Sequence, residues 1–424
     1  MKTAEDLQTQ QLAQRLRMAQ QRTEHIFSMV HPDAYYEKPI PLRHPIVFYE
    51  GHLPAFIWNT LFRNILGADS FDPQLDLLFA RGIDPSDLTT ADALNQKTWP
   101  DREAVQRYKN GIHQRFYAFL ESGDSVPHTA VIFLLLEHEL MHQETLMYIL
   151  HQLPHHLKQR PDDIKPLSTG TAPLPVMREI SEGTAILGAM PGEFPFVWDN
   201  EIPVQNVTVP AFAMDAYNIT NGQFLEFMAA GGYETRAFWE QETWDWRSEN
   251  NITHPFFWRK QDDTWILRDF FEDIPLPHDW PVYVTHAEAR AYARYAGKEL
   301  PTEAEWHRAA YGDNLDQPCD TGNVNFERYS PVPVGSFPQN ASPYGIYDLI
   351  GNGWEWTSTP FMPFPGFEAS EAYPQYSADF FDGNHFVIKG GSPFTDARLL
   401  RRSFRNWFYW HYPYMYATFR CVTH

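Results

Sequence analysis

The sequence predicts an α+β protein in which a helical bundle precedes a loop-rich domain of short strands and helices. Up to about residue 157, apolar residues recur with helical periodicity in several long segments. After residue 175 the chain becomes rich in Gly, Trp and Tyr and shows short alternating runs. The stretch between them, KPLSTGTAPLP at 165–175, is rich in Pro, Ser, Thr and Gly, which is typical of a linker. We therefore expect a four-helix-bundle domain at 1–165, a linker at 166–175 and a second domain at 176–424.

Each expected element follows from its own periodicity. In the first domain, helices are predicted at 4–29, 55–66, 102–122 and 129–153. In the second domain, helical patterns occupy 221–230 and 286–296, and an alternating run at 204–209 is typical of a strand.

Composition limits the classes of partner. A chain of 424 residues with 43% hydrophobic and 16% aromatic residues can bury more than one core. The formal net charge of -21, with only 33 Lys and Arg spread along the chain, argues against a nucleic-acid partner. The N-terminus lacks the apolar core of a signal peptide, and no apolar run approaches the roughly 18 residues of a membrane span. Small-molecule partners are expected.

Cysteine usage predicts the compartment. Only two cysteines occur, Cys319 and Cys421, which are too few for a disulfide framework and lack CxxC metal spacing. A reducing cytoplasm fits best. No helix shows the heptad seam of a coiled coil, so we expect a monomer.

Two histidines stand four residues apart inside the apolar helix predicted at 129–153. Positions i and i+4 lie on one helix face about 5 to 6 Å apart, so the rings of His138 and His142 can reach one metal ion. Leu and Met residues flank them, and unpaired imidazoles buried there would be costly. The pattern therefore favours metal binding over the alternative, two buried histidines whose ring nitrogens are hydrogen-bonded within the core.

A third ligand must come from another segment. His52 ends a short apolar run, VFYEGH, just before the helix predicted at 55–66, and a histidine at such a helix entrance can point into a bundle core. Other histidines of the first domain also remain candidates for the third ligand: His25, His113 and His128. Three histidines suit iron, zinc, nickel or copper, so the metal also stays open.

The segment 401–421, RRSFRNWFYWHYPYMYATFRC, has nine aromatic residues in twenty-one positions. Most of these rings are expected in a β-rich core. Arg, Asn and His residues interleaved among them also allow a polar lining for a pocket. Trp407 could hold a quaternary ammonium by cation-π attraction while the amide of Asn406 orients a carboxylate or an imidazole.

Motifs in both halves resemble one known family. The pattern HxxxHxE at His138, His142 and Glu144, with FYEGH upstream, resembles the DinB-like iron-binding domain of ergothioneine-pathway sulfoxide synthases, which are related to ovothiol and selenoneine synthases. The second half resembles the formylglycine-generating-enzyme domain, which has a C-type-lectin-like fold. The segments that carry this second resemblance are GKELPTEAEW at 297–306, YGIYDLIGNGWEW at 344–356, GGS at 390–392 and FRC at 419–421.

The resemblance implies a non-heme iron(II) enzyme. In that family, three histidines, here His52, His138 and His142, would hold Fe(2+) and leave coordination positions open for substrate and O2. The reaction would join a thiol donor, cysteine or γ-glutamylcysteine, to imidazole C2 of hercynine (trimethylhistidine) and oxidise the sulfur to the sulfoxide. Glu144 would orient a ligand ring, or it is simply a carboxylate on the helix surface.

Further site residues follow from the same resemblance. A tyrosine that donates a proton to reduced oxygen would be Tyr373, or else Tyr376; a phenol with a pKa near 10 is protonated at neutral pH. Packing of a loop ring is the alternative for either. Asn406 and Trp407 fall where the family's Asn-Trp pair contacts the imidazole substrate.

The chain departs from the family at several positions. Relatives that use γ-glutamylcysteine carry an acidic residue after the Asn-Trp pair and a basic one shortly afterwards, whereas here the positions are occupied by Phe408 and by Trp410, His411 and Tyr412. Free cysteine or an uncharged thio- or selenosugar is therefore an alternative donor. Met141 stands where some relatives place a Gln that touches the imidazole.

Other interpretations remain open. The formylglycine-generating enzymes act through paired cysteines, and Cys421 alone lies near the motif, so no formylglycine-generating activity is expected. Within the same family, a selenoneine-type synthase or a histidine-using, ovothiol-type synthase is an alternative. Outside it, a DinB-like zinc or nickel thiol transferase and a non-enzymatic lectin-like binding module are the further candidates.

Overall fold

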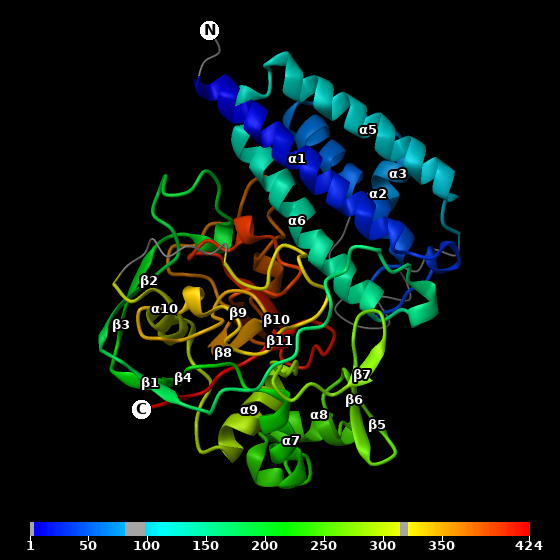
Figure 1. The fold of residues 1–424 in the computed structure, drawn as a ribbon. Helices are drawn as coiled ribbons and strands as arrows, with labels where there is room; N and C mark the ends of the chain where they lie inside the picture. Colours follow the sequence, from blue (N-terminus) through cyan, green and yellow to red (C-terminus); the bar gives the residue numbers. More distant parts are fainter. Residues whose placement is uncertain (1–3, 81–97, 314–320) are drawn as a thin grey trace. The chain divides into compact units, whose positions relative to one another are not determined.

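The computed structural model describes residues 4–80, 98–313 and 321–424 (Figure 1). Its chain divides into two compact units, Met1–Asp162 and Asp163–His424. The first unit is helical and the second mixes helices with short strands, so the α+β prediction is confirmed.

Four long helices make up most of the described part of the first unit. They are α1 (Ala4–Ser28), α2 (Ile46–Ile57), α5 (Arg102–Ser122) and α6 (Thr129–His151), with a short α3 (Pro73–Leu78) between α2 and α5. Helix α1 packs on α5 and α6, and α2 packs on the same two helices, which closes a bundle. The helices predicted at 4–29, 102–122 and 129–153 are confirmed within two residues at each end.

The helix predicted at 55–66 begins earlier than expected. Helix α2 starts at Ile46 and continues after Ile57 as a π-helical segment, Trp58–Ile65. His52 therefore lies inside a helix, and the expectation of a helix entrance was wrong. The local signals from Gly51 and Pro54 are overridden because every residue of α2 is buried. Gly51 is required there, since a Cβ at this position would overlap the ring of Phe79.

In the described residues of the second unit, the strands form four small sheets. Their strand orders are β1-β4-β12, β10-β9-β8-β11, β2-β3 and β5-β6-β7. The strands are β1 (Met177–Ile180), β2 (Gly183–Leu187), β3 (Gln205–Val209), β4 (Phe212–Asp215), β5 (Trp258–Gln261), β6 (Thr264–Arg268), β7 (Asp273–Pro275), β8 (Trp354–Pro360), β9 (His385–Lys389), β10 (Asn406–Tyr409), β11 (Ala417–Thr418) and β12 (Val422–Thr423). The strand-like run at 204–209 is confirmed as β3.

Four helices accompany these sheets: α7 (Asn221–Ala229), α8 (Gln241–Glu249), α9 (His286–Tyr295) and α10 (Glu303–Tyr311). Helices α7, α9 and α10 each begin with a capping box, in which a Thr side chain accepts from the backbone three residues on and the side chain there returns the bond. The predicted helices at 221–230 and 286–296 are confirmed as α7 and α9.

Glu355 on β8 organises the core of the second unit. Its fully buried carboxylate accepts hydrogen bonds from Arg420, from the indole of Trp306 and from the amide of Asn218. A buried carboxylate is tolerated there because each oxygen is satisfied and the charge is paired. These bonds fix the sheet that carries β9 and β10.

Cys421 is a buried, free thiol, whereas Cys319 lies outside the described residues. Within the described ranges, no helix combines the length and the apolar character needed to cross a membrane.

Candidate metal centre and aromatic cluster

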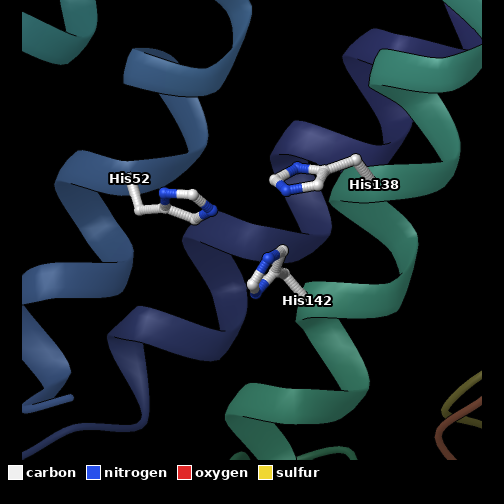
Figure 2. A group of neighbouring side chains, drawn as sticks. All are labelled: His52, His138 and His142. Atoms are coloured by element: carbon white, nitrogen blue, oxygen red, sulfur yellow. The ribbon is translucent and has the colours of Figure 1, made fainter. Parts of the chain in front are cut away.

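Three histidines of the first unit converge on one point. His52 comes from α2, and His138 and His142 come from successive turns of α6 (Figure 2). One ring nitrogen of each lies within 4.8 Å of those of the other two. In the described part of the chain, no other group of three or more His, Cys, Asp or Glu side chains meets this geometry. His52 and His138 are buried and His142 is partly exposed.

Sequence alone left several histidines as candidates for the third ligand. His25 is exposed on α1, while His113 and His128 are half-buried on other segments. None of these joins the group. The structure thus brings only His52 to the i, i+4 pair.

The orientation of His52 is fixed by a backbone contact. Its Nδ1 lies 2.8 Å from the carbonyl oxygen of Phe79, so Nδ1 carries the proton and donates it. Nε2 is left buried without a hydrogen-bond partner among the described residues. The buried Nδ1 of His142 likewise has no hydrogen-bond partner among the described residues. Orphaned buried nitrogens are costly unless something binds them, and a metal ion would do so.

Aromatic rings pack the walls of the histidine group. The ring of Phe56 stacks on His138 with centroids 3.6 Å apart and 7° between the planes. Phe48 stacks on His52 at 5.2 Å. These contacts restrict rotation of the ligand rings, which pre-orients them for a shared ion.

Burial keeps the three imidazoles neutral. Desolvation lowers the pKa of His52 to about 4. Desolvation, followed by repulsion from the neighbouring rings, lowers the pKa of His138 and His142 well below the ordinary value of 6.5. A neutral imidazole is the form that ligates a metal. The residues therefore fit a divalent transition metal, although three nitrogen donors do not choose among iron, zinc, nickel and copper.

Met141 and Glu144 lie beside the ligands on α6, and both are half-buried. Glu144 follows His142 by two positions, and residues two apart do not share a helix face. Its role in orienting a ligand ring stays a prediction, as does the contact of Met141 with a substrate.

The second unit brings together several of the predicted substrate-site residues. Tyr376 meets Trp407 edge to face, with centroids 5.3 Å apart and 79° between the planes. Tyr373 lies next to Tyr376 at 5.9 Å. Phe361 stacks on Trp407 at 4.1 Å and 6°, and so covers one face of the indole. We call Tyr373, Tyr376, Trp407 and Phe361 the aromatic cluster.

Other predicted residues do not join the aromatic cluster. Asn406 precedes Trp407 on β10, and adjacent strand positions point to opposite faces of the sheet; its Oδ1 accepts from the backbone N–H of Trp407 at 2.9 Å. Phe408 instead contacts Tyr412 at 5.3 Å. His411 packs against its neighbour Trp410 and against Trp246, which lies on helix α8.

Two residues that contact the aromatic cluster or the loop that carries its tyrosines were not identified from the sequence. Trp198 stacks on Tyr376 with centroids 3.8 Å apart and 21° between the planes. Asp199 follows it and hydrogen-bonds the loop that carries both tyrosines. Neither residue belongs to a periodic run, so no local signal could have assigned them. Their partners lie more than 170 positions away.

Comparisons with known proteins agree with both halves of this architecture. Residues 165–424 match the family model of the sulfatase-modifying factor enzyme 1-like domain. Hercynine oxygenase of Mycobacterium tuberculosis is 35% identical over 311 residues, covering 68% of this chain and 69% of that protein. Hercynine oxygenase of Mycolicibacterium smegmatis is 32% identical over 429 residues, covering 93% of this chain and 94% of that protein.

A fungal relative is a longer protein, of which the match covers about half. Ergothioneine biosynthesis protein 1 of Neurospora crassa is 27% identical over 489 residues, covering 91% of this chain and 54% of that protein. Together with the histidine group, these similarities define a metal-dependent oxygenase with a sulfatase-modifying factor enzyme 1-like domain. The chain belongs to the hercynine oxygenase family.

Proposed function

We propose that this oxygenase is an iron(II)- and O2-dependent sulfoxide synthase of ergothioneine biosynthesis, which joins a thiol donor to imidazole C2 of hercynine. The observation that carries the proposal is the convergence of His52, His138 and His142 in a chain related to hercynine oxygenases. Residues 1–165 would form the metal-binding bundle, 166–175 the linker and 176–424 the substrate-binding domain.

The overall reaction balances without any further reductant. One C–H bond at imidazole C2 and one S–H bond of the donor break, and a C–S bond and an S–O bond form. These changes release four electrons and two protons, which reduce O2 so that one oxygen atom enters the sulfoxide and the other leaves as water. When bound, iron(II) would supply coordination positions for the thiolate and O2 and a route for electrons between them.

The histidines would hold the metal as neutral ligands through Nε2 of His52, Nδ1 of His142 and a ring nitrogen of His138. The support for this assignment is the burial and the missing partners of the first two atoms. The carbonyl oxygen of Phe79 would keep His52 in the required tautomer.

A proton would come from the aromatic cluster. Tyr376 is buried and its ring contacts both Trp198 and Trp407, whereas Tyr373 is partly exposed. A phenol with an ordinary pKa near 10 holds its proton at neutral pH and can deliver it to reduced oxygen. The more rigid placement favours Tyr376 as donor, with Tyr373 beside it.

Trp407 and Asn406 would bind hercynine. The trimethylammonium group would bind to the Trp407 indole by cation-π attraction, beside Phe361 and Phe380, which also contact this ring. The amide of Asn406 would contact the imidazole or the carboxylate. Met141, on α6 of the first unit, stands where some relatives place a Gln that touches the imidazole and is a further substrate-binding candidate.

The sulfur donor would be cysteine or γ-glutamylcysteine, bound near Phe408, His411 and Tyr412. Burial lowers the pKa of His411, so all three side chains are uncharged at neutral pH. This observation also favours a second candidate, a selenoneine-type synthase that takes an uncharged selenosugar, because no charge is needed at these positions to bind it.

Reconstitution tests the proposal. Protein loaded with iron(II) under anaerobic conditions is mixed with hercynine and one donor at a time, cysteine, γ-glutamylcysteine or a selenosugar, and then exposed to air. We expect an oxidised adduct by mass spectrometry and matching oxygen consumption. His138→Ala should lose iron and turnover, and His113→Ala, a half-buried histidine outside the group, should lose neither. Bound iron without an oxidised adduct from any donor rules the proposal out.

A further inference from the structure

A turn near the start of the second unit reaches the loop that carries both candidate tyrosines. Asp199 begins a 3-10 turn, Asp199–Glu201, and its side chain is buried. One carboxylate oxygen accepts a hydrogen bond from the hydroxyl of Ser377, and the other accepts from the backbone N–H of Ser370 at 3.2 Å. A single carboxylate therefore ties together the two ends of the segment 370–377, which contains Tyr373 and Tyr376.

The residue before the turn adds a third contact. Trp198 stacks on Tyr376 with centroids 3.8 Å apart, and Trp407 meets the same ring edge to face at 5.3 Å. Stacked aromatic pairs of this kind stabilise a fold beyond the area that they bury. Trp198 thus contacts the tyrosine ring, while the adjacent Asp199 bonds the backbone and the serine that flank it.

The turn is itself fixed. Glu201 is fully buried and accepts hydrogen bonds from Arg401 and from the hydroxyl of Ser403 at 2.6 Å. The guanidinium of Arg405 donates to the carbonyl oxygen of Asn200 at 3.2 Å. Charge-assisted bonds of this type are stronger than neutral ones. Asp199 therefore lies in a turn whose position is fixed by these hydrogen bonds.

The tyrosine loop needs such support. Between β8, which ends at Pro360, and β9, which begins at His385, the chain contains only one short 3-10 turn, Ala378–Phe380, and no strand. Without ladder hydrogen bonds, the position of Tyr376 depends on side-chain contacts from elsewhere.

We propose that Asp199 is a positioning residue: by joining Ser370 to Ser377 from a rigid turn, it fixes Tyr376 against Trp407 and so places the phenol for proton delivery. This inference rests on the proposed function for the role of the phenol, whereas the placement of the loop stands on the contacts alone. Misplacement of a reacting group by about 1 Å can cost on the order of 100-fold in rate.

Two readouts test it on the full-length, iron-loaded protein. Ser377→Ala removes one of the two hydrogen bonds to Asp199, and Asp199→Asn weakens both of them. The matched control is Ser330→Ala, because Ser330 also donates to a buried carboxylate, that of Asp269 at 2.7 Å, outside the aromatic cluster. Hydrogen exchange of segment 370–380 is measured by mass spectrometry, and kcat and KM for hercynine are measured across pH.

We expect Ser377→Ala and Asp199→Asn to speed exchange of this segment about 10-fold, the effect of losing one hydrogen bond to a charged group. We also expect kcat to fall about 10-fold or more, with KM for hercynine changed less than about twofold. The control should change neither. If Asp199→Asn does not fold, Ser377→Ala decides.

Unchanged exchange in Ser377→Ala overturns the positional claim. Faster exchange with an unchanged kcat and pH profile overturns its role in proton delivery. An inactive wild-type protein would instead reject the proposed function, and the exchange experiment would still decide whether Asp199 fixes the loop.

Discussion

The Nδ1 atom of His52 lies 2.8 Å from the carbonyl oxygen of Phe79, and the ring of Phe79 lies against Gly51, the residue that precedes His52. One aromatic residue thus both packs against α2 and orients the imidazole that α2 supplies. The packing of the bundle and the geometry of the metal centre are coupled at this point.

The first prediction concerns Gly51→Ala. A Cβ at this position would overlap the ring of Phe79, so the ring and the carbonyl must shift. We expect a loss of about 1 to 3 kcal/mol in the free energy of unfolding. We also expect metal affinity to fall about 10-fold, because the contact that orients His52 is disturbed. Urea unfolding and titration with Zn(II) against a chelator measure the two effects.

Gly111→Ala is the control for this prediction. A Cβ at residue 111, on α5, would overlap the ring of Phe71 in the same way, but Phe71 does not contact the three histidines. It should lower stability to a similar extent and leave zinc affinity unchanged. Equal losses of affinity in both variants would show that Phe79 has no special role in orienting His52.

The second prediction separates the two candidate tyrosines. Tyr376→Phe keeps the ring contacts with Trp198 and Trp407 but removes the hydroxyl, so KM for hercynine should change little. Loss of a general acid typically costs about 100- to 10,000-fold in rate, so kcat should fall within that range. Tyr373→Phe should lower kcat much less. The reverse order in steady-state kinetics would assign proton delivery to Tyr373.

The third prediction concerns a buried ion pair in the bundle. Lys109 on α5 lies 3.0 Å from Glu50 on α2, and both side chains are almost fully buried. Lys109→Met would leave the carboxylate of Glu50 without its closest cation. We expect a loss of about 3 kcal/mol in the free energy of unfolding, the lower end for a broken buried ion pair, because Arg102 still lies 3.8 Å from Glu50; urea titration measures it.

Arg107→Met provides the comparison on the same helix. Arg107 pairs with Glu103 at 3.7 Å, and both side chains are well exposed. Such a pair contributes less than about 0.5 kcal/mol because water and salt screen it. Similar losses in the two variants would contradict the importance of burial.

The fourth prediction concerns acid stability. His286 on α9 is buried and its Nε2 lies 3.1 Å from the carbonyl oxygen of Thr357. Burial, with a smaller effect of Arg290, lowers the pKa of His286 to about 3. The unfolded chain, with an ordinary pKa near 6.5, therefore takes up a proton that the folded state excludes between about pH 3 and 6.5.

The stabilising contribution of neutral His286 is complete above about pH 6.5 and is lost as the pH falls through this window. One such proton adds a slope of about 1.4 kcal/mol per pH unit to the free energy of unfolding. His286→Gln removes the titrating group, so urea unfolding from pH 7.5 down to 4.5 should show a shallower slope than the wild type. Identical slopes in the variant and the wild type would contradict the assignment.

Local sequence patterns predicted the long helices well. Helix α5 was predicted with its observed bounds, Arg102–Ser122, and α6 ends two residues earlier than expected. Both helices carry their own apolar periodicity, and α5 also begins with a capping side chain, Asp101, which accepts a hydrogen bond from the backbone N–H of Ala104. For α2 the same reasoning failed, since Gly51 and Pro54 weaken a helix that burial of all its residues nevertheless maintains.

The residues of the two candidate sites also divide into those that local sequence predicts and those that only the packing of the chain brings together. By itself, the sequence determined the pairing of His138 with His142, because a spacing of four residues on one helix places both rings on one face. Only the tertiary structure decided that His52 meets them, while other histidines of that domain do not, and that Trp198 and Asp199 reach the tyrosine loop. Contacts between distant segments depend on how elements pack against each other, and no local period along the chain encodes that packing.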